Sequence, residues 1–341
     1  MRQFTGFQKG INLGGWLSQS SLAPERLETF IQEEDIQRIA SFGADHVRLP
    51  VDYPLIETED GCPIEHGYTY IDRCVTWCEK YGLNMILDLH KTAGYVFDDA
   101  ENCNDFFHND ALQNRFLSLW DKLSARYGKY DFIAFDLLNE IVDPDVSDIW
   151  NSLAANAIER IRRFAPQNWI LVGGPCYNSI NTVKYILPPP DEGIVYSFHF
   201  YEPYLFTHQG AYWDKKMPSE FRVSYPQTAG HFREISDSQL DGVFSGIFKN
   251  MNDSAQGVEM IAPLFEEAIS VAESRNVPLY CGEYGVINLA NPEYALAWHK
   301  DMHAVFEKYQ IGRALWSYKE MDFGLIDEHY KEYFDELITL L

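Results

Sequence analysis

Two glutamates each stand in a stretch that is typical of a buried strand. Glu140 ends IAFDLLNE (133–140), and Glu283 lies in PLYCGEYG (278–285). A buried strand loses stability by ending on a carboxylate unless that group meets water or a ligand. Two carboxyl groups about 5–5.5 Å apart can hydrolyse a glycosidic bond with retention, because one protonates the leaving oxygen and the other attacks the anomeric carbon. Glu140 and Glu283 are candidates for this chemistry.

Other polar or aromatic residues end the remaining predicted strands. Alone, each has a structural explanation, such as a surface ion pair for an arginine or a core position for a tryptophan. These residues share one end of successive strands, however, and in a parallel barrel catalytic groups from several strands converge at that end. The shared position favours a common site built from Arg48, Asp88, His90, Asn139, Glu140, His199, Tyr201, Glu283 and Trp316.

The two carboxyl groups of such a site need different protonation states. The acid must hold a proton near neutral pH, whereas the nucleophile must be ionised, and donors such as Arg48 and Tyr201 would keep it so. Asn139 would hydrogen-bond the 2-hydroxyl of the sugar, where contacts strengthen as the oxocarbenium-like transition state forms.

Short apolar segments alternate with amphipathic stretches along the whole chain. Nearly continuous apolar runs are expected of strands covered on both faces, and about eight strand–helix units predict an α/β fold that closes into a (β/α)8 TIM barrel. A doubly wound open sheet is the alternative, although GINLGGW lacks the G-x-G-x-x-G spacing of a dinucleotide site. The predicted strands are 9–15, 45–50, 84–90, 133–140, 168–174, 194–201, 278–285 and 312–318, and the predicted helices are 27–43, 70–82, 111–128, 148–166, 257–276 and 293–310.

One connection is too long for an ordinary loop of such a barrel. Residues 202–256 are predicted to form an inserted subdomain on the sixth βα loop, within a single catalytic domain that spans residues 1–341. The insertion would lie on the rim of the site, either as a lid or wall for the substrate or as structural padding.

Composition narrows the class of partner. A net charge of −24 disfavours nucleic acid and anionic membranes, because both would repel the chain. A neutral substrate meets no such repulsion, and the 15% aromatic content supplies flat surfaces for sugar rings as well as core. The sequence as it stands shows no secretory leader, which predicts a cytoplasmic protein, or a secreted one if a leader was removed. A monomer is expected.

The cysteines do not follow the pattern of a disulfide framework. Cys74 and Cys78 lie four residues apart on one face of a predicted helix, but no second pair at zinc-ligand spacing accompanies them, which predicts buried free thiols. The six cysteines are Cys62, Cys74, Cys78, Cys103, Cys176 and Cys281.

The residues at the strand ends also carry a resemblance. Their types and order resemble the eight-residue signature of glycoside hydrolase family 5, of clan A, over essentially the whole chain from GINLGGWL to ALWSYKEMDF. Segments such as DHVRLPVDYPLIE, IVYSFHFYEPYLFTHQ and LYCGEYGVI resemble the clostridial cellulase C type, which has an inserted subdomain after strand 6. The matching residues are Arg48, His90, Asn139, Glu140, His199, Tyr201, Glu283 and Trp316.

The resemblance implies a retaining double displacement. Glu140 would be the acid/base and Glu283 the nucleophile, with Arg48 and Tyr201 positioning and ionising Glu283. It implies neither a metal nor an organic cofactor.

The other signature residues would bind the sugar at the −1 subsite, where the bond breaks. The resemblance implies that His90 and Asn139 contact this sugar, that His199 lies beside Glu140, and that Trp316 forms the floor.

The chain departs from the family pattern at two positions. Ile141 stands where proline often follows the acid/base glutamate, and Lys91 follows His90 where relatives often carry a small residue or a second histidine. Two weaker candidates are Trp213, as an aromatic platform in the insertion, and Asp322, as an acceptor for a sugar hydroxyl.

Several activities remain open at the level of the sequence. The leading prediction is hydrolysis of β-1,4 or mixed β-1,3/1,4 glucans or their oligosaccharides. An exo-acting β-glucosidase, a β-1,3-glucanase and a β-mannanase are alternatives on the same fold, and NLGGWL also occurs in exo-1,3-glucanases. From other classes, a catalytically silent carbohydrate-binding barrel and a metal-dependent barrel hydrolase remain.

Overall fold

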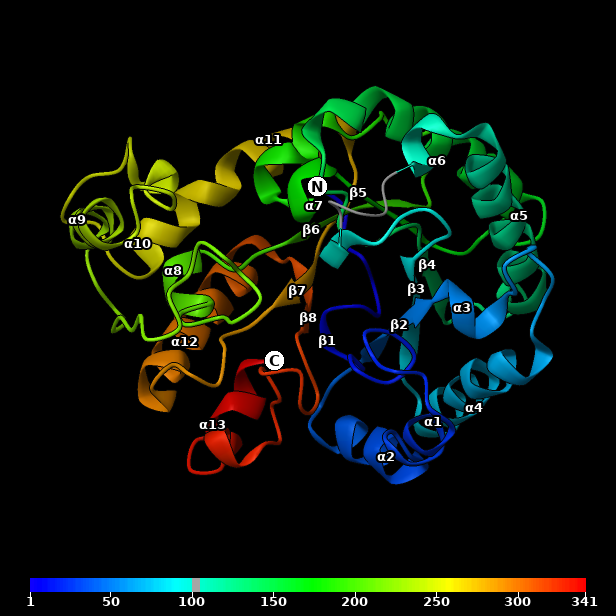
Figure 1. The fold of residues 1–341 in the computed structure, drawn as a ribbon, viewed down its shortest axis with the longest axis horizontal. Coiled ribbons are helices and arrows are strands. Elements are labelled where there is room, and N and C mark those ends of the chain that lie inside the picture. The colour runs from blue at the N-terminus through cyan, green and yellow to red at the C-terminus, as the bar shows by residue number, and fades with distance from the viewer. Residues whose placement is uncertain (100–104) are drawn as a thin grey trace.

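The computed structural model describes residues 1–99 and 105–341, and it contains a closed barrel of parallel strands in sequence order. Each neighbouring pair is parallel, including β1 with β8, which closes the ring and confirms the predicted barrel (Figure 1). The strands are β1 (Lys9–Asn12), β2 (His46–Asp52), β3 (Asn84–Lys91), β4 (Ile133–Asp136), β5 (Ile170–Gly173), β6 (Ile194–His199), β7 (Leu279–Tyr284) and β8 (Gly312–Leu315).

Helices surround the barrel, as Figure 1 shows. They cover the outer face of the sheet, which explains why most strands are buried along their whole length. The helices are α1 (Pro24–Thr29), α2 (Glu33–Ser41), α3 (Tyr53–Ile56), α4 (Glu65–Tyr81), α5 (Asp110–Tyr127), α6 (Ser147–Arg162), α7 (Pro175–Asn178), α8 (Tyr204–Thr207), α9 (Ala229–Gln239), α10 (Val258–Ile261), α11 (Glu266–Arg275), α12 (Pro292–Tyr309) and α13 (Phe334–Leu337).

Two predicted helices are each broken in the structure. The stretch 27–43 was wrong as one helix, because Gln32 and Asp35 form a capping box that starts α2 afresh. The stretch 257–276 is divided into α10, a 3₁₀ turn that contains Pro263, and α11. In both cases the apolar spacing continues across the break, and a capping contact or a proline sets the boundary.

Successive side chains of each strand point alternately into the barrel and out of it. Residues from six strands form a cluster of their own with Phe4 and Phe7 of the N-terminal segment, and this apolar layer fills the barrel below the site. Its strand members are Ile86, Ala134, Leu171, Val195, Tyr280 and Ala314. Two positions further along β3 and β4, the same inward face carries Asp88 and Asp136.

The fifth strand is not followed by a regular α-helix. The chain turns through α7, where Cys176, Tyr177 and Asn178 all have positive φ, and continues as a 3₁₀ helix over Ile180–Tyr185. The left-handed backbone is uncommon for residues other than glycine. It places the Tyr177 backbone beside the loop that follows β4, since its N–H donates to the Ile141 carbonyl at 2.9 Å.

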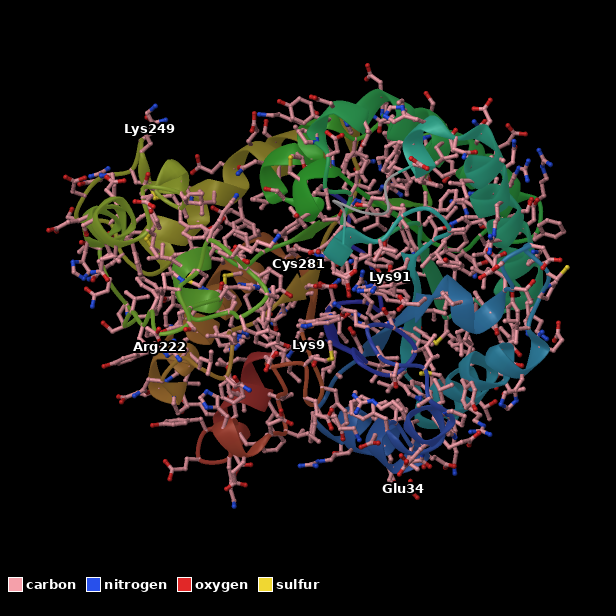
Figure 2. All side chains as sticks on the ribbon, viewed as in Figure 1. Lys9, Glu34, Lys91, Arg222, Lys249 and Cys281 are labelled. Carbon is pink, nitrogen blue, oxygen red and sulfur yellow. The ribbon has the colours of Figure 1, made fainter. Side chains whose placement is uncertain are left out.

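The long connection after β6 folds back on itself. It carries α8, α9 and a 3₁₀ turn (Gly246–Phe248), and its far end returns through an antiparallel bridge between Thr228 and Gln256. In Figure 1 these elements lie beside α10 and α12, outside the ring of barrel helices. Figure 2 shows Arg222 and Lys249 on this connection after β6, whereas Lys91 lies near the barrel centre. We retain residues 202–256 as a proposed inserted subdomain.

The described cysteines include no disulfide, and Cys74 and Cys78 are both buried, as the spacing predicted. Cys103 lies outside the described residues. Within residues 1–99 and 105–341, no helix combines the length and apolar character that a membrane span requires.

Candidate active site

The two glutamates singled out in the sequence meet at the carboxyl ends of the strands. An oxygen of Glu140 and an oxygen of Glu283 lie within 4.8 Å of one another, and His199 lies between them. The Nδ1 atom of His199 is 2.8 Å from Glu140 Oε1 and 3.6 Å from Glu283 Oε2. This separation fits the roughly 5–5.5 Å of a retaining pair and is too short for the 6.5–9.5 Å of an inverting pair.

Glu140 lies four residues beyond the end of β4, on irregular backbone. Its φ of +40° is in the left-handed region, a conformation that costs a non-glycine residue about 1–3 kcal/mol and persists only where neighbours enforce it. The chain before it is tied to β3, because the Asn139 N–H donates to the Leu89 carbonyl at 3.2 Å. The Glu140 side chain is 14% exposed, so it is largely desolvated and still reachable.

Glu283 is held within β7 by two donors. Arg48 Nη1 donates to its Oε1 at 2.8 Å, and the Tyr201 hydroxyl donates to its Oε2 at 3.0 Å. Burial raises the pKa of Tyr201, so this phenol stays protonated and remains a donor. Donors on both oxygens favour the charged carboxylate.

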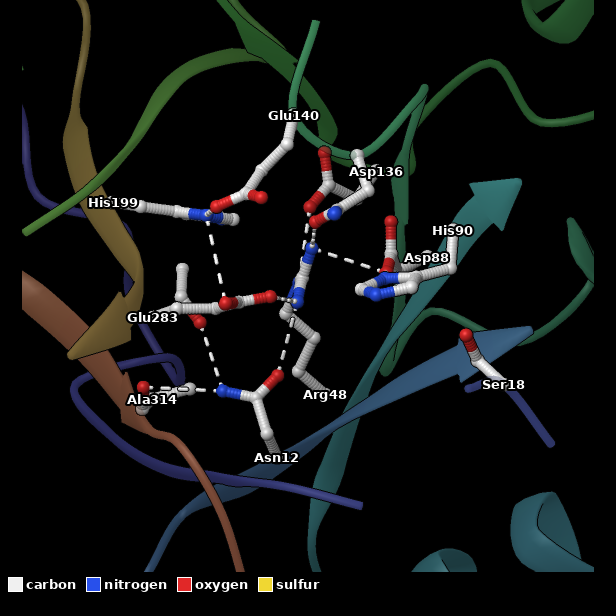
Figure 3. A network of polar contacts seen from close by, with 12 residues as sticks. Asn12, Ser18, Arg48, Asp88, His90, Asp136, Glu140, His199, Glu283 and Ala314 are labelled. Carbon is white, nitrogen blue, oxygen red and sulfur yellow. Dashed lines mark hydrogen bonds and ion pairs between the residues drawn. The ribbon is translucent and has the colours of Figure 1, made fainter. Parts of the chain in front are cut away.

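Arg48 is the centre of a buried polar network, shown in Figure 3. It lies inside β2, not at its end as predicted, and its guanidinium is fully buried. Its donors are all used, since Nε donates to Asp136, Nη1 donates to Asn12 and Glu283, and Nη2 contacts Asn139 and Asp88. Because all of its donors are engaged, the guanidinium is held in one position. Through its hydrogen bond it also holds the Glu283 carboxylate in place.

The guanidinium faces three carboxyl groups, which cannot all be neutralised by one charge. Burial raises the pKa of Asp88 and of Asp136 to about 7, although Arg48 opposes the rise in both cases. Each of these two carboxyl groups also has one oxygen without a partner among the described residues. Near neutral pH, Asp88 and Asp136 are therefore partly protonated.

The environment of Glu140 favours its protonated form. Burial raises the pKa of Glu140 to about 8, Arg48 opposes the rise, and the charges of Asp88 and Asp98 add to it. Burial also lowers the pKa of His199 to about 4, so this imidazole is neutral at pH 7 and adds no positive charge beside Glu140. One carboxyl group is thus kept protonated at neutral pH while the other is surrounded by donors.

His90 and Trp316 form a second wall of the site. Nδ1 of His90 lies 2.6 Å from Asp88 Oδ2, and its ring is parallel to that of Trp316, with centroids 5.9 Å apart. Burial lowers the pKa of His90 to about 3, so the ring is neutral. Its Nε2 atom and the Nδ2 atom of Asn139 are buried without partners among the described residues.

The two weaker candidates lie on the rim. Trp213 is 44% exposed and packs near Phe323, whose ring lies 6.0 Å from that of Tyr201. The carboxylate of Asp322 is hydrogen-bonded to the phenol of Tyr212 and raises its pKa together with burial. Trp213 is thus one ring away from the site, and Asp322 has a protein partner.

The structure brings together all eight residues of the predicted signature, and sequence reasoning overlooked three that support them. Asn12 and Asp136 share the Arg48 network, and Tyr95 hydrogen-bonds the backbone on both sides of Ile141. Asp136 had a signal in the sequence, since it is an acid within the apolar run FDLLNE. Tyr95 had none, because its contact depends on how two loops meet.

Within the described residues, one group of side chains has donor atoms close enough to share a metal ion: Glu140, His199 and Glu283. These are the carboxyl pair and the histidine that contacts both of them.

Comparison with known proteins agrees with this geometry. The family model described as "Cellulase (glycosyl hydrolase family 5)" matches residues 8–322 of this chain. Endoglucanase C of Acetivibrio thermocellus is 41% identical over 340 residues, which cover 98% of each chain. Cellodextrinase A of Ruminococcus flavefaciens is 42% identical over 314 residues, covering 92% of this chain and 86% of that protein.

The fold is shared with solved structures at lower identity. The crystal structure of endoglucanase Cel5A from Thermotoga maritima superposes with a TM-score of 0.76 at 22% identity, covering 98% of this chain and 96% of that one. The family match spans most of the chain and includes both glutamates. The protein belongs to glycoside hydrolase family 5 and is a retaining β-glycosidase.

Proposed function

We propose that this enzyme cleaves β-1,4 or mixed β-1,3/1,4 glucosidic bonds in glucans or their oligosaccharides, with Glu140 as acid/base and Glu283 as nucleophile. The observation that carries the proposal is the approach of the two carboxyl groups to within 4.8 Å. Their unequal surroundings assign the roles, since Glu140 is kept protonated at neutral pH by burial and Glu283 accepts from Arg48 and Tyr201.

In the first step, a carboxylate oxygen of Glu283 attacks the anomeric carbon. The bond from that carbon to the leaving oxygen breaks, and the proton of Glu140 moves to this oxygen, which releases the aglycone as an alcohol. The products are a glycosyl ester on Glu283 and an ionised Glu140.

In the second step, water attacks the same carbon from the face that the aglycone left. Glu140 now accepts a proton from the water, and Glu283 departs as a carboxylate. Two inversions return the sugar with its β configuration, and both side chains regain their starting protonation states.

Two buried groups without protein partners fit the sugar at the −1 subsite. The Asn139 amide, whose oxygen is fixed by Arg48 Nη2 at 2.9 Å, keeps its Nδ2 free to donate to the 2-hydroxyl. His90, held by Asp88, offers Nε2 to a second hydroxyl. Trp316 lies against the His90 ring and would form the apolar floor.

The substrate class is supported by the names of the relatives, an endoglucanase and a cellodextrinase. The test is chromatography of early products from barley mixed-linkage glucan, carboxymethylcellulose, laminarin, mannan and cello-oligosaccharides. Oligosaccharides from the first two support an endo-acting β-glucanase. Glucose as the sole early product would replace it by exo action, and turnover restricted to laminarin or mannan would contradict the proposed linkage or sugar.

The protonation of Glu140 predicts the basic limb of the pH profile. The acid must be protonated in the free enzyme, so kcat/KM should fall about tenfold per pH unit once the pH exceeds the Glu140 pKa of about 8. The measurement is kcat/KM on a cello-oligosaccharide from pH 5 to 10. The Glu140→Gln variant, assayed on an aryl cellobioside whose leaving group needs no proton, should lack this limb. An unchanged limb in that variant would assign the titration to another group.

A further inference from the structure

The backbone that carries Glu140 is held by the hydroxyl of one tyrosine. The Tyr95 hydroxyl donates to the Glu140 carbonyl at 2.7 Å and accepts from the Val142 N–H at 2.9 Å. A single oxygen thus joins the two peptide groups that flank Ile141. These two hydrogen bonds lie next to the strained backbone of Glu140, whose φ of +40° is in the left-handed region.

Tyr95 is itself fixed in place. It pairs with Thr92 through two backbone hydrogen bonds in the loop after β3, and its buried ring packs edge-on against Phe107 and near Phe106. Burial raises the pKa of its hydroxyl, so the hydroxyl stays protonated and remains a donor. The hydroxyl is therefore a rigid point from the third βα loop to which the fourth can be tied.

The residue between the two tied peptide groups is anchored from another side. The Ile141 side chain is fully buried, and its carbonyl accepts from the Tyr177 N–H at 2.9 Å. Relative to proline, which fixes its own φ, isoleucine leaves the chain after Glu140 free to rotate. The contacts of Tyr95 and Tyr177 supply a restraint that the Ile141 backbone does not provide.

We propose that Tyr95 is a positioning residue for proton transfer: its hydroxyl sets the backbone of Glu140 so that the carboxyl group reaches the leaving oxygen. The inference rests on the proposed role of Glu140 as acid/base. Removing the hydroxyl leaves a partly buried carbonyl and a partly buried N–H without this partner, and the left-handed backbone loses one of the contacts that enforce it. A carboxyl group displaced by about 1 Å loses rate on the order of 10²-fold.

The test is Tyr95→Phe, assayed with two leaving groups. A cello-oligosaccharide has a poor leaving group that needs the proton of Glu140. The 2,4-dinitrophenolate of 2,4-dinitrophenyl β-cellobioside, in contrast, leaves without a proton. We expect kcat/KM on the oligosaccharide to fall by about 10- to 100-fold, and kcat/KM on the aryl substrate to change by less than about twofold because its glycosylation step bypasses the acid. The ratio of the two values on one sample does not depend on the fraction of folded enzyme.

Tyr196→Phe is the matched control. The Tyr196 ring is also fully buried, and its hydroxyl likewise donates to a carbonyl, that of Leu187 at 2.8 Å, and accepts from Arg275 at 2.9 Å. This variant also loses one hydrogen bond to a backbone carbonyl and one from an N–H donor, and it should keep the wild-type ratio. If Tyr95→Phe also keeps that ratio, or lowers both activities equally, Tyr95 is only structural and the inference is wrong.

Glu140→Ala, run in the same assays, separates the two hypotheses. It should lose the oligosaccharide activity and retain the aryl activity. If it does so while Tyr95→Phe keeps the wild-type ratio, only the inference about Tyr95 fails. If Glu140→Ala loses both activities alike, the acid role of Glu140 fails, and the positioning role of Tyr95 fails with it.

Discussion

Replacing Glu283 by alanine is expected to lower kcat/KM on cello-oligosaccharides by on the order of 10⁵-fold, because no other group then forms the covalent intermediate. The fold should survive, since the side chain lies at the mouth and its loss frees donors of Arg48 and Tyr201 that water can satisfy. The measurement is kcat/KM, together with the thermal unfolding midpoint to establish that the variant is folded.

Azide distinguishes the nucleophile from the acid/base by the configuration of the product. In Glu283→Ala, azide attacks a β-aryl cellobioside directly and should yield the α-glycosyl azide after one inversion. In Glu140→Ala, azide attacks the glycosyl ester on Glu283 and should yield the β-glycosyl azide after two inversions. The opposite pair of products would exchange the roles of the two glutamates, and unchanged activity in Glu283→Ala would remove it from the reaction.

Replacing Arg48 by methionine is the second change with a large expected effect. Methionine replaces the aliphatic stem of arginine but not its charged guanidinium, so Asp88, Asp136 and Glu283 lose their shared cation within a buried site. Removing one partner of a buried ion pair costs about 3–5 kcal/mol of unfolding free energy. Because Glu283 also loses the donor to its Oε1, kcat/KM should fall about 10²- to 10³-fold.

The loss of stability in Arg48→Met should depend on pH. Unfolded aspartate ionises near pH 3.9, whereas Asp88 and Asp136 in the folded protein have a pKa of about 7 even with Arg48 present. Folded pKa values above the unfolded ones give stability that is complete at low pH and is lost as the pH rises through the folded pKa. Without Arg48 these folded pKa values rise further, so the gap between variant and wild type should stay constant at acidic pH, where both folded forms are protonated, and widen as the pH rises above about 7.

Arg313→Met provides a control for the loss of a buried arginine. Arg313 is also buried, but it pairs with Glu307 and with the carbonyl of Leu341, away from the site. Urea unfolding should show a loss of stability in this variant, while kcat/KM per folded molecule stays near that of the wild type. Equal loss of kcat/KM in both arginine variants would show that Arg48 acts through stability alone.

The sequence predicted the barrel and the signature residues because both follow from regular spacing. Short apolar segments, most of them nearly continuous, marked all eight strands, and residues that end strands in a closed parallel barrel must meet at one mouth. Glu140 and Glu283 could therefore be paired across more than a hundred residues. Their separation could not be predicted, since it depends on three irregular residues between the end of β4 and Glu140.

Other features were set by contacts that leave no periodic trace. The break between α1 and α2 comes from a capping box at Gln32, within a stretch whose apolar spacing continues. The absence of a regular helix after β5 follows from the left-handed backbone at Cys176 and Tyr177, which no residue type there requires. The hydroxyl of Tyr95 reaches Glu140 only because the third and fourth βα loops meet.

The role of Asp136 could have been predicted from the sequence. An acid within an apolar run is costly unless it is paired, and Arg48 of β2 supplies that pairing at 3.1 Å. The same argument applies to Asp88, which contacts Arg48 at 3.0 Å. Matching buried acids to buried bases along the strands would have predicted the network beneath the catalytic pair.

The central claim is that Glu283 forms a covalent bond to the sugar. The most direct measurement is to incubate the enzyme with 2,4-dinitrophenyl 2-deoxy-2-fluoro-β-cellobioside, which slows the second step, and to map the added mass by peptide mass spectrometry. The account predicts one fluorocellobiosyl group per enzyme, on the peptide that contains CGEYG and at Glu283. A label on Glu140 or another carboxylate, or no label from an enzyme that is active on the parent cellobioside, would contradict it.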